Sequence, residues 1–150
     1  MVTSSRFAVA VHVLVALAMQ EGRPITSEQV ASSVRTNPSV IRRLLSMLAD
    51  AGLTTSQLGT GGGALLARPA GEITLLDAYR AVEEPELFAT HRTPPDTGCI
   101  VGRNVLPVLA ATTCRAQRAL EAELGGVTVA DVARGVVERD RAPREAPADA

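Results

Sequence analysis

Apolar residues recur at helical spacing between residues 37 and 52, so one face of this segment is expected to be buried. Four of them stand at positions i, i+3, i+4 and i+7: Ile41, Leu44, Leu45 and Leu48. Asn37 suits an N-cap and Pro38 the first helical position, where a missing N–H costs nothing. Gly52 can end the helix in a left-handed conformation. The pattern predicts an amphipathic helix.

A shorter helix is predicted directly before it. Thr26 and Gln29 have the spacing of a capping box, and Val30 and Val34 give a brief apolar stripe. Residues 35–37 form a sharp corner. Two short helices, a tight turn and a basic outer face indicate a helix-turn-helix. The alternative is an ordinary helix pair of an all-α domain, with Arg42 and Arg43 on a solvated face.

A glycine-rich hairpin is predicted next. Residues 53–58 and 64–68 have strand-like composition and flank the run from Gly59 to Gly63. A hairpin directly after a recognition helix is typical of the wing of a winged helix. A phosphate-binding loop is the alternative. It is disfavoured because no GK[ST] follows and the glycines do not open a helix after a buried strand.

The first helix is predicted from a cap at Ser4 or Ser5 to about Gln20. It is apolar nearly all round and should be buried on more than one side. His12 within it is interpreted as a hydrogen-bonded core or interface histidine, since no second metal ligand stands at helical spacing. The apolar run of 13 residues is too short to span a bilayer and lacks a basic leader, which argues against a signal peptide.

Three further segments follow the hairpin. Thr74 and Asp77 have capping-box spacing and predict a helix to about Val82. A polar loop follows over residues 83–102, and a long helix over 103–124. Thr128 and Asp131 cap a last short helix, and the tail 138–150 is disordered by composition. The apolar stripe of the long helix comprises Val105, Val108, Leu109, Thr112, Ala116, Ala119, Leu120 and Leu124.

The long helix is predicted to pair with the same helix of a second copy of the chain. The alternative is that it is buried in the monomer's own core. The expected fold is mostly α with a small β wing. It comprises a winged helix-turn-helix over 1–82, a sensor-type loop over 83–102, and the dimerisation helix with a short C-terminal helix over 103–137. The tail 138–150 completes the chain.

Charge is divided unevenly along the 150 residues, whose net charge is −1. Residues 1–69 hold six arginines against three acidic residues, and residues 70–150 hold nine against thirteen. A mildly basic first half fits a DNA reader joined to an assembly or sensing half. The small excess argues against a generic polyanion binder, so affinity should require two copies. Two cysteines and no targeting segment indicate a reducing cytoplasm.

The order of these elements resembles the Rrf-two family of bacterial winged-helix transcriptional regulators, over roughly residues 3–137. The most specific pieces are Gly59-Thr60-Gly61-Gly62-Gly63, Leu66-Ala67-Arg68-Pro69 and Ile73-Thr74-Leu75-Leu76-Asp77. The family includes the iron–sulfur cluster regulator, the nitric-oxide-sensitive repressor and the cysteine-metabolism repressor. The resemblance implies a homodimer joined through the long helix, with recognition helices in successive major grooves of palindromic double-stranded DNA.

The same resemblance implies which residues meet DNA. The recognition helix would present Asn37, Ser39, Val40, Arg42 and Arg43. The wing residues Thr60, Gly61 and Gly62 would enter the adjacent minor groove. Ser4, Ser5 and Arg6 would hold phosphates at the N-terminus of the first helix. The family wing often has an arginine before the glycines and a tyrosine after them. Here Gln57-Leu58 and Ala64 fill these places, so the wing contact should be weaker.

The cysteines depart further from the family pattern. Cluster-binding members carry three closely spaced cysteines in the loop, whereas this chain has Cys99 there and Cys114 in the helix. His91 supplies at best a second ligand, so no iron–sulfur cluster and no metal is expected. Cys99 is the candidate sensor thiol. Cys114 lies about 16 Å further along the expected helix, too far for a bridge within one subunit. An intersubunit bridge and a purely structural role for both thiols remain open.

These observations predict a dimeric, sequence-specific transcriptional regulator, expected to be a repressor, with a thiol or small-molecule input. The alternative is a winged-helix interaction module that no longer binds DNA, consistent with the near-neutral charge and the depleted wing. A thiol enzyme centred on Cys99 is disfavoured, because neither a Cys-x-x-Cys motif nor a set of His and Asp partners is visible. The chain is therefore not expected to be an enzyme.

Overall fold

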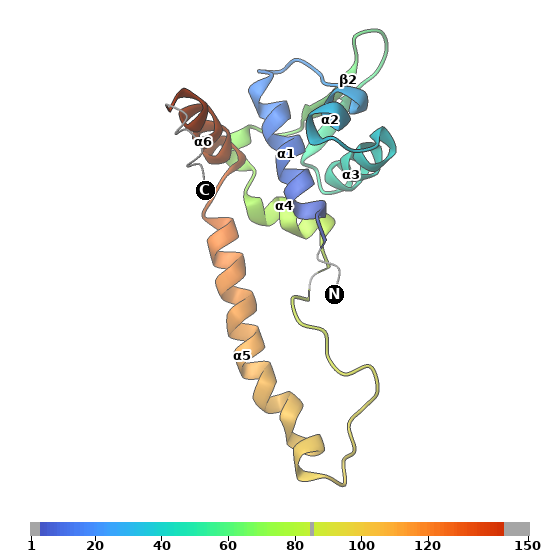
Figure 1. The fold of residues 1–150 in the computed structure, drawn as a ribbon, viewed down its shortest axis with the longest axis vertical. Helices are drawn as coiled ribbons and strands as arrows, with labels where there is room; N and C mark the ends of the chain where they lie inside the picture. Colours follow the sequence, from blue (N-terminus) through green and yellow to red (C-terminus); the bar gives the residue numbers. More distant parts are fainter. Residues whose placement is uncertain (1–3, 85, 143–150) are drawn as a thin grey trace, which may run out of the picture.

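The protein consists of a compact group of helices from which one long helix projects (Figure 1). The computed structural model describes residues 4–84 and 86–142. The elements are α1 (Arg6–Met19), α2 (Ser27–Val34), α3 (Pro38–Asp50), β1 (Thr54–Gln57), β2 (Gly63–Leu66), η1 (Ala70–Glu72), α4 (Leu75–Val82), α5 (Ile100–Gly125) and α6 (Val129–Arg141). We call α1–α4, the two strands and α6 the head, and α5 with residues 86–99 the arm. The mostly helical fold with a small β wing is as predicted.

Helix α1 forms the centre of the head. Ala10, Val13 and Leu14 are fully buried on it, and the helix packs against α2, α3, α4, α6 and β2. The prediction that α1 is covered on more than one side is confirmed. His12 is hydrogen-bonded, with its Nε2 2.9 Å from the Ser33 hydroxyl oxygen, but it lies at the surface and not in a core. Within residues 7–19 of α1, His12 is the one polar residue, and its side chain is exposed.

The helix starts agree closely with the predicted capping boxes. At α2, α4 and α6 the N-cap threonine accepts from the backbone of the third helical residue, whose side chain accepts in return. Asn37 caps α3 by accepting from the backbone N–H of Ser39 at 2.8 Å. Gly52 has φ 72°, and Leu53 N donates to Leu48 O at 2.9 Å, a Schellman motif that ends α3. Local sequence therefore fixes most element boundaries in the head.

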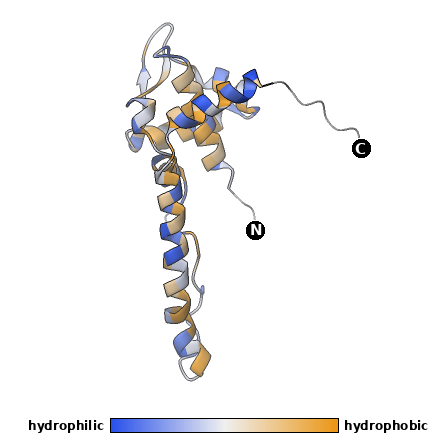
Figure 2. Ribbon diagram, turned by 90° about the vertical axis from the view of Figure 1, so that its left-hand side faces the viewer, coloured by the Kyte–Doolittle hydropathy of each residue, from blue (hydrophilic) through white to orange (hydrophobic). Residues whose placement is uncertain are grey.

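The arm is the one region where a helix has no core. None of the 26 residues of α5, all of which the structure describes, is buried. Figure 2 shows hydrophobic and hydrophilic residues mixed along the projecting helix. The exposed fraction of the Val108 side chain is 73%. No helix within residues 4–84 and 86–142 is long and apolar enough to cross a membrane.

Helix α5 begins at Ile100, three residues before the predicted start at Arg103. The Asp96 carboxylate accepts from Gly98 N at 2.8 Å, and Cys99 N donates to Asp96 O, so a turn leads straight into the helix. A Cβ at Gly102 would lie 2.0 Å from Asp96 O, so only glycine lets this turn pack on the first helical turn. The polar, proline-containing composition of 87–102 predicts a loop up to Gly102, and no side-chain N-cap marks the earlier start.

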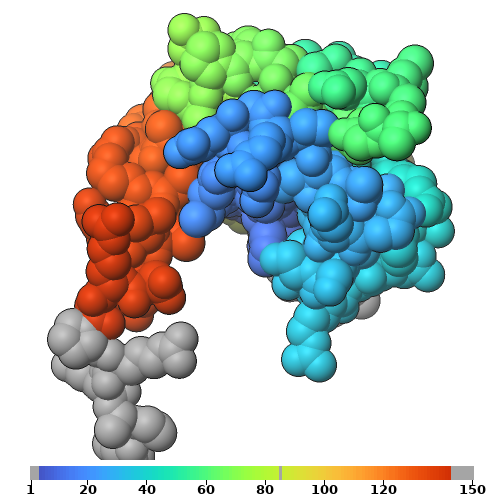
Figure 3. Space-filling model, turned by 90° about the horizontal axis from the view of Figure 1, so that it is seen from above, coloured from blue at the N-terminus to red at the C-terminus, as the bar shows by residue number. Residues whose placement is uncertain are grey.

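Helix α6 differs from its prediction in both length and place. It continues to Arg141, although the tail was expected to be disordered from residue 138. The charged residues at its end favour disorder by composition, but Glu and Arg are also good helix formers. Residues 143–150 lie outside the described part. The sequence groups α6 with the dimerisation helix, whereas in the structure it packs on α1 and η1, and Figure 3 shows it beside α1. Val129 of α6 is fully buried.

Candidate nucleic-acid interface

The corner between α2 and α3 is built without glycine. Arg35 follows α2 in the left-handed conformation, with φ 60° and ψ 51°. Thr36 N then donates to Ala31 O at 3.0 Å and Arg35 N to Ser32 O at 3.3 Å. These bonds satisfy the last carbonyls of α2 and turn the chain directly into the Asn37 cap of α3. Non-glycine residues adopt this conformation at a cost, so the corner is locally strained.

Helix α3 has a buried face and an exposed face, as predicted. Ile41, Leu44 and Leu48 are buried against the head. The five residues predicted to face DNA are all exposed: Asn37, Ser39, Val40, Arg42 and Arg43. A rigid helix with an exposed polar and basic N-terminal half has the form that enters a DNA major groove.

Arg42 is held by an acidic partner that the sequence did not reveal. Its Nη2 lies 2.6 Å from Oε1 of Glu28 in the first turn of α2, and both side chains are more than half exposed. The Arg42 hydrogen bond is the largest of the causes that lower the pKa of Glu28. Glu28 is 14 residues away along the chain. No local pattern marks such a pair, because it depends on the angle between two helices.

The wing is a two-stranded antiparallel sheet that is hydrogen-bonded to α3 and to the residue before the N-cap of α2. Thr54 pairs with Leu66 and Gln57 with Gly63. The Thr54 hydroxyl donates to Leu45 O of α3 at 3.3 Å. On the other side, Ile25 and Ala64 exchange backbone hydrogen bonds of 3.0 and 2.8 Å. The wing therefore has a defined position relative to α3.

The tip of the wing carries little that could read DNA except its backbone. Thr60 and Gly61 are exposed and Gly62 is half-buried. Gly62 N donates to Gly59 O, and a Cβ at Gly62 would lie 2.2 Å from Gln57 O. Glycine is thus required for the turn itself. The exposed fraction of Leu58 is 91%, so an apolar side chain projects where a basic one would attract phosphate.

An open cleft of about 460 Å³ separates α2, α3 and the wing. Its lining includes Glu28, Arg42, Ser46, Thr55 and Gln57. The ion pair therefore lies beside an open space between α3 and the wing.

The N-terminus of α1 is already occupied by side chains of the head. The Ser4 hydroxyl accepts from Arg6 N at 3.2 Å. Glu83 accepts from Phe7 N at 3.1 Å, and its other oxygen lies 3.2 Å from Arg6 Nη2. A carboxylate thus fills the place in which the sequence suggested a DNA phosphate. Phosphate binding by Ser4, Ser5 and Arg6 stays a prediction, and it would require displacement of Glu83.

The two cysteines are far apart. Cys99 is the exposed N-cap of α5, and the backbone N–H groups of Gly102 and Val101 lower the pKa of its thiol by hydrogen bonding. Cys114 lies 15 residues along the same helix, about 22 Å at 1.5 Å per residue. No group of three or more His, Cys, Asp or Glu side chains that could hold a metal occurs within the described ranges. Cys99 and Cys114 therefore do not supply the ligands of a four-ligand iron–sulfur cluster.

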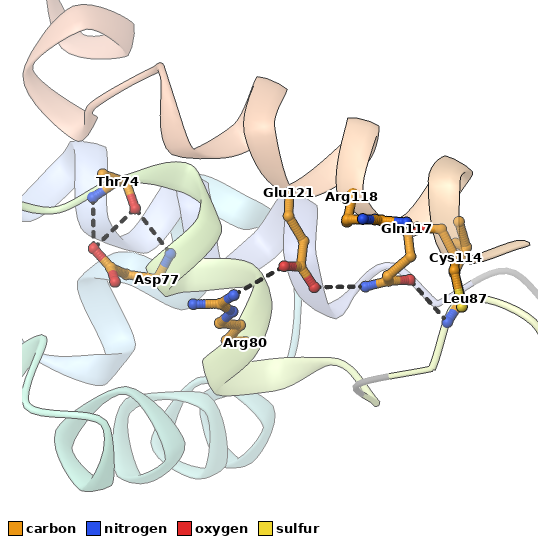
Figure 4. A network of polar contacts seen from close by, with 8 residues as sticks. All are labelled: Thr74, Asp77, Arg80, Leu87, Cys114, Gln117, Arg118 and Glu121. Carbon is orange, nitrogen blue, oxygen red and sulfur yellow. Dashed lines mark hydrogen bonds and ion pairs between the residues drawn. The ribbon is translucent and has the colours of Figure 1, made fainter. Parts of the chain in front are cut away.

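A chain of polar contacts joins the arm to the head (Figure 4). Arg80 of α4 donates to Glu121 of α5 at 3.0 Å, and Gln117 donates to the other oxygen of Glu121 at 2.9 Å. The side-chain amide oxygen of Gln117 (Oε1) in turn accepts from Leu87 N at 3.3 Å. The loop that leads to Cys99 is therefore connected through α5 to α4, which packs against α1 and α3.

Comparisons with known proteins agree with this geometry. The model of the Rrf2 (Rrf-two) family, described as iron-dependent transcriptional regulator, matches residues 3–135. YwnA of Bacillus subtilis (strain 168), a candidate HTH-type transcriptional regulator, is 43% identical over 130 residues, which is 86% of this chain and 95% of YwnA.

Two solved structures have the same fold. One, the crystal structure of a candidate DNA binding protein, is 39% identical with a TM-score of 0.69, and the match covers 85% of this chain and 98% of that one. The other is IscR of T. potens, with a TM-score of 0.72 at 23% identity, covering 95% of this chain and 93% of that one. At that identity the second likeness concerns the fold alone.

Proposed function

The chain belongs to the Rrf2 family of transcriptional regulators, and from that membership we propose that it is a homodimeric, sequence-specific DNA-binding repressor. The observation that carries the proposal is the outer face of α3. Its five exposed residues from Asn37 to Arg43 stand on a helix whose other face is locked into the head. An arginine on such a face can form a bidentate pair with guanine, worth about 1–3 kcal/mol of discrimination.

The arm supports the proposed homodimer. Its 26-residue helix has no buried residue within one subunit. Its exposed apolar side chains include Val101, Val108 and Leu109, and a second copy of α5 would cover them. Because two copies related by a two-fold axis present two α3 helices, the operator is expected to be palindromic. Pairing also supplies the affinity that one weakly basic head lacks.

The proposed DNA binding is tested by selecting duplexes from a random-sequence pool with the unaltered protein. We expect an enriched palindrome, and at least a tenfold loss of affinity for it in Arg42→Ala and in Arg43→Ala. Arg139→Ala on α6 is the matched control and should bind as the unaltered protein does. If no sequence is enriched, the alternative of an interaction module without DNA binding is favoured.

For the input we propose the Cys99 thiol. Its support is the exposed position at the start of α5 and the lowered pKa. Iodoacetamide labelling of Cys99 across pH, with Cys114→Ser as the background, should give a midpoint below that of a free cysteine. A midpoint at or above the free value would remove the thiol input.

A small-molecule input is favoured by a different feature, an open apolar cavity of about 360 Å³ between residues 88–91 and α5. If Cys99 proves unreactive, a ligand of this cavity is the input to seek.

A further inference from the structure

We propose that Glu28 is a specificity-determining residue, which positions the Arg42 guanidinium for one base and opposes its use on any phosphate. The inference rests on the proposed function, because it concerns how α3 chooses its sequence. Its basis is the Arg42–Glu28 ion pair of 2.6 Å across the helix-turn-helix. Glu28 stands on α2, the helix that is not expected to enter the groove.

The position of Glu28 is fixed by the capping box of α2. Thr26 and Gln29 bond each other's backbone N–H groups at 3.2 and 2.9 Å, so the turn that carries Glu28 is ordered. The Ser27 hydroxyl donates to Glu28 Oε2 at 3.5 Å, while Oε1 accepts from Arg42. The helix N-terminus also favours a carboxylate here. Arg42 is thus bonded to a carboxylate that stands on an ordered helical turn and also accepts from Ser27.

A tethered guanidinium behaves differently from a mobile one. Arginine presents five N–H donors in a planar fork, and a bond to Nη2 fixes the plane while the other donors remain available. A guanine edge requires two donors in one orientation, so a fixed plane improves the fit to that base. A phosphate accepts donors from many directions, and a mobile arginine can reach it from the open cleft beside the pair.

The Glu28 carboxylate adds repulsion to this geometry. Both partners are exposed, so the pair contributes little to folding. A negative charge beside the reading arginine disfavours the DNA backbone, which is the main attraction on non-specific sites. The pair therefore lowers non-specific affinity more than affinity for the correct base. An exposed ion pair that adds little folding stability can therefore still raise the ratio of specific to non-specific DNA affinity.

The test uses the full-length protein, the palindrome enriched by selection, and a scrambled duplex of the same length. Glu28→Ala should tighten binding to the scrambled duplex and lower the ratio of the two affinities at least tenfold. Its plot of log affinity against log salt on the scrambled duplex should steepen by about one unit, because Arg42 becomes free to contact one more phosphate. Glu72→Ala on η1, which also removes an exposed carboxylate, should change neither quantity.

Arg42→Ala and the double variant show whether Glu28 acts through Arg42. The double variant should have the affinity ratio of Arg42→Ala alone and no steeper salt dependence. Glu28→Ala that behaves as Glu72→Ala, or losses that multiply in the double variant, would overturn this inference and leave DNA recognition intact. Failure of the unaltered protein to enrich any sequence would overturn both. Circular dichroism and thermal melts of each variant confirm that the head is folded.

Discussion

The head and the arm are built on opposite principles. In the head, short helices with clear caps enclose a core in which Leu14, Ile41 and Leu48 are almost inaccessible to solvent. In the arm, a helix about 39 Å long has no buried residue, and its large exposed apolar side chains, Ile100, Val101, Val108 and Leu109, lie in its first half. The head therefore stabilises itself, whereas the arm presents apolar side chains that a second copy would cover in the proposed homodimer. Under that proposal, folding and assembly are assigned to different parts of the chain.

The largest effect is expected from a substitution that removes packing contacts from the core of the head. Leu48→Ala should lower the free energy of unfolding by about 2–5 kcal/mol, because it opens a cavity in a fully packed core. Denaturant unfolding measures the change. Leu58→Ala makes the identical substitution at the exposed wing tip and should stay within about 0.5 kcal/mol. Equal losses at the two leucines would mean that the head has no dominant core.

The corresponding test of the arm is Val108→Asp. A carboxylate on each subunit would be buried without a partner, so the dissociation constant of the dimer should rise at least about a hundredfold, or about 2.8 kcal/mol. Sedimentation equilibrium measures it, and circular dichroism should show an unchanged head. Leu58→Asp places the same charge on an exposed leucine outside α5 and should leave the dimer intact. A dimer that tolerates Val108→Asp would place the assembly surface elsewhere.

A smaller effect is expected at the corner of the helix-turn-helix. Arg35→Gly should stabilise the head by up to about 1 kcal/mol, because glycine adopts the left-handed conformation without steric cost. Arg43→Gly removes the same side chain from the interior of α3 and should cost about 1 kcal/mol. Thermal unfolding of the two variants should therefore shift in opposite directions. A destabilised Arg35→Gly would mean that the arginine side chain itself holds the corner.

The smallest effect concerns the cap where the chain returns from the arm to the head. Hydrogen bonds from the Thr128 backbone and hydroxyl, with a smaller contribution from Arg134, lower the pKa of Asp131. A depressed folded pKa stabilises the protein above the unfolded value, about 3.9, and this contribution is lost as the pH falls through the folded pKa. Asp131→Asn should therefore lower the melting temperature at neutral pH and have less effect near pH 2. Asp50→Asn at the end of α3 is the control.

Much of the head could be predicted because its signals are local. A capping box needs two residues three apart, and Thr26–Gln29, Thr74–Asp77 and Thr128–Asp131 all have that spacing and that structure. The buried face of α3 follows from its helical period. The exposure of Arg42 and Arg43 follows from the same period, so the candidate site was in large part visible in the sequence.

The remaining features depend on residues that are distant in the sequence. Glu28 meets Arg42 and Glu83 meets Arg6 only after helices have packed. Helix α5 can start early because the Asp96 carbonyl packs closely against Gly102. No capping side chain predicts this start from the sequence. The left-handed Arg35 was not expected, because sequence favours glycine at such a position. Ion pairs between residues that are distant in the sequence and close contacts between backbone atoms cannot be predicted from local sequence patterns.

The backbone bridge between Thr74 and Thr128 has a consequence for the order in which the protein forms. Val129 completes the core of a unit whose other core residues end at Val82, so the chain must close a loop of 46 residues (83–128) to finish that unit. During synthesis, α5 leaves the ribosome before α6 does. The assembly surface is therefore present while the head is still incomplete. A nascent chain is expected to require protection of that surface until its last helix has been made.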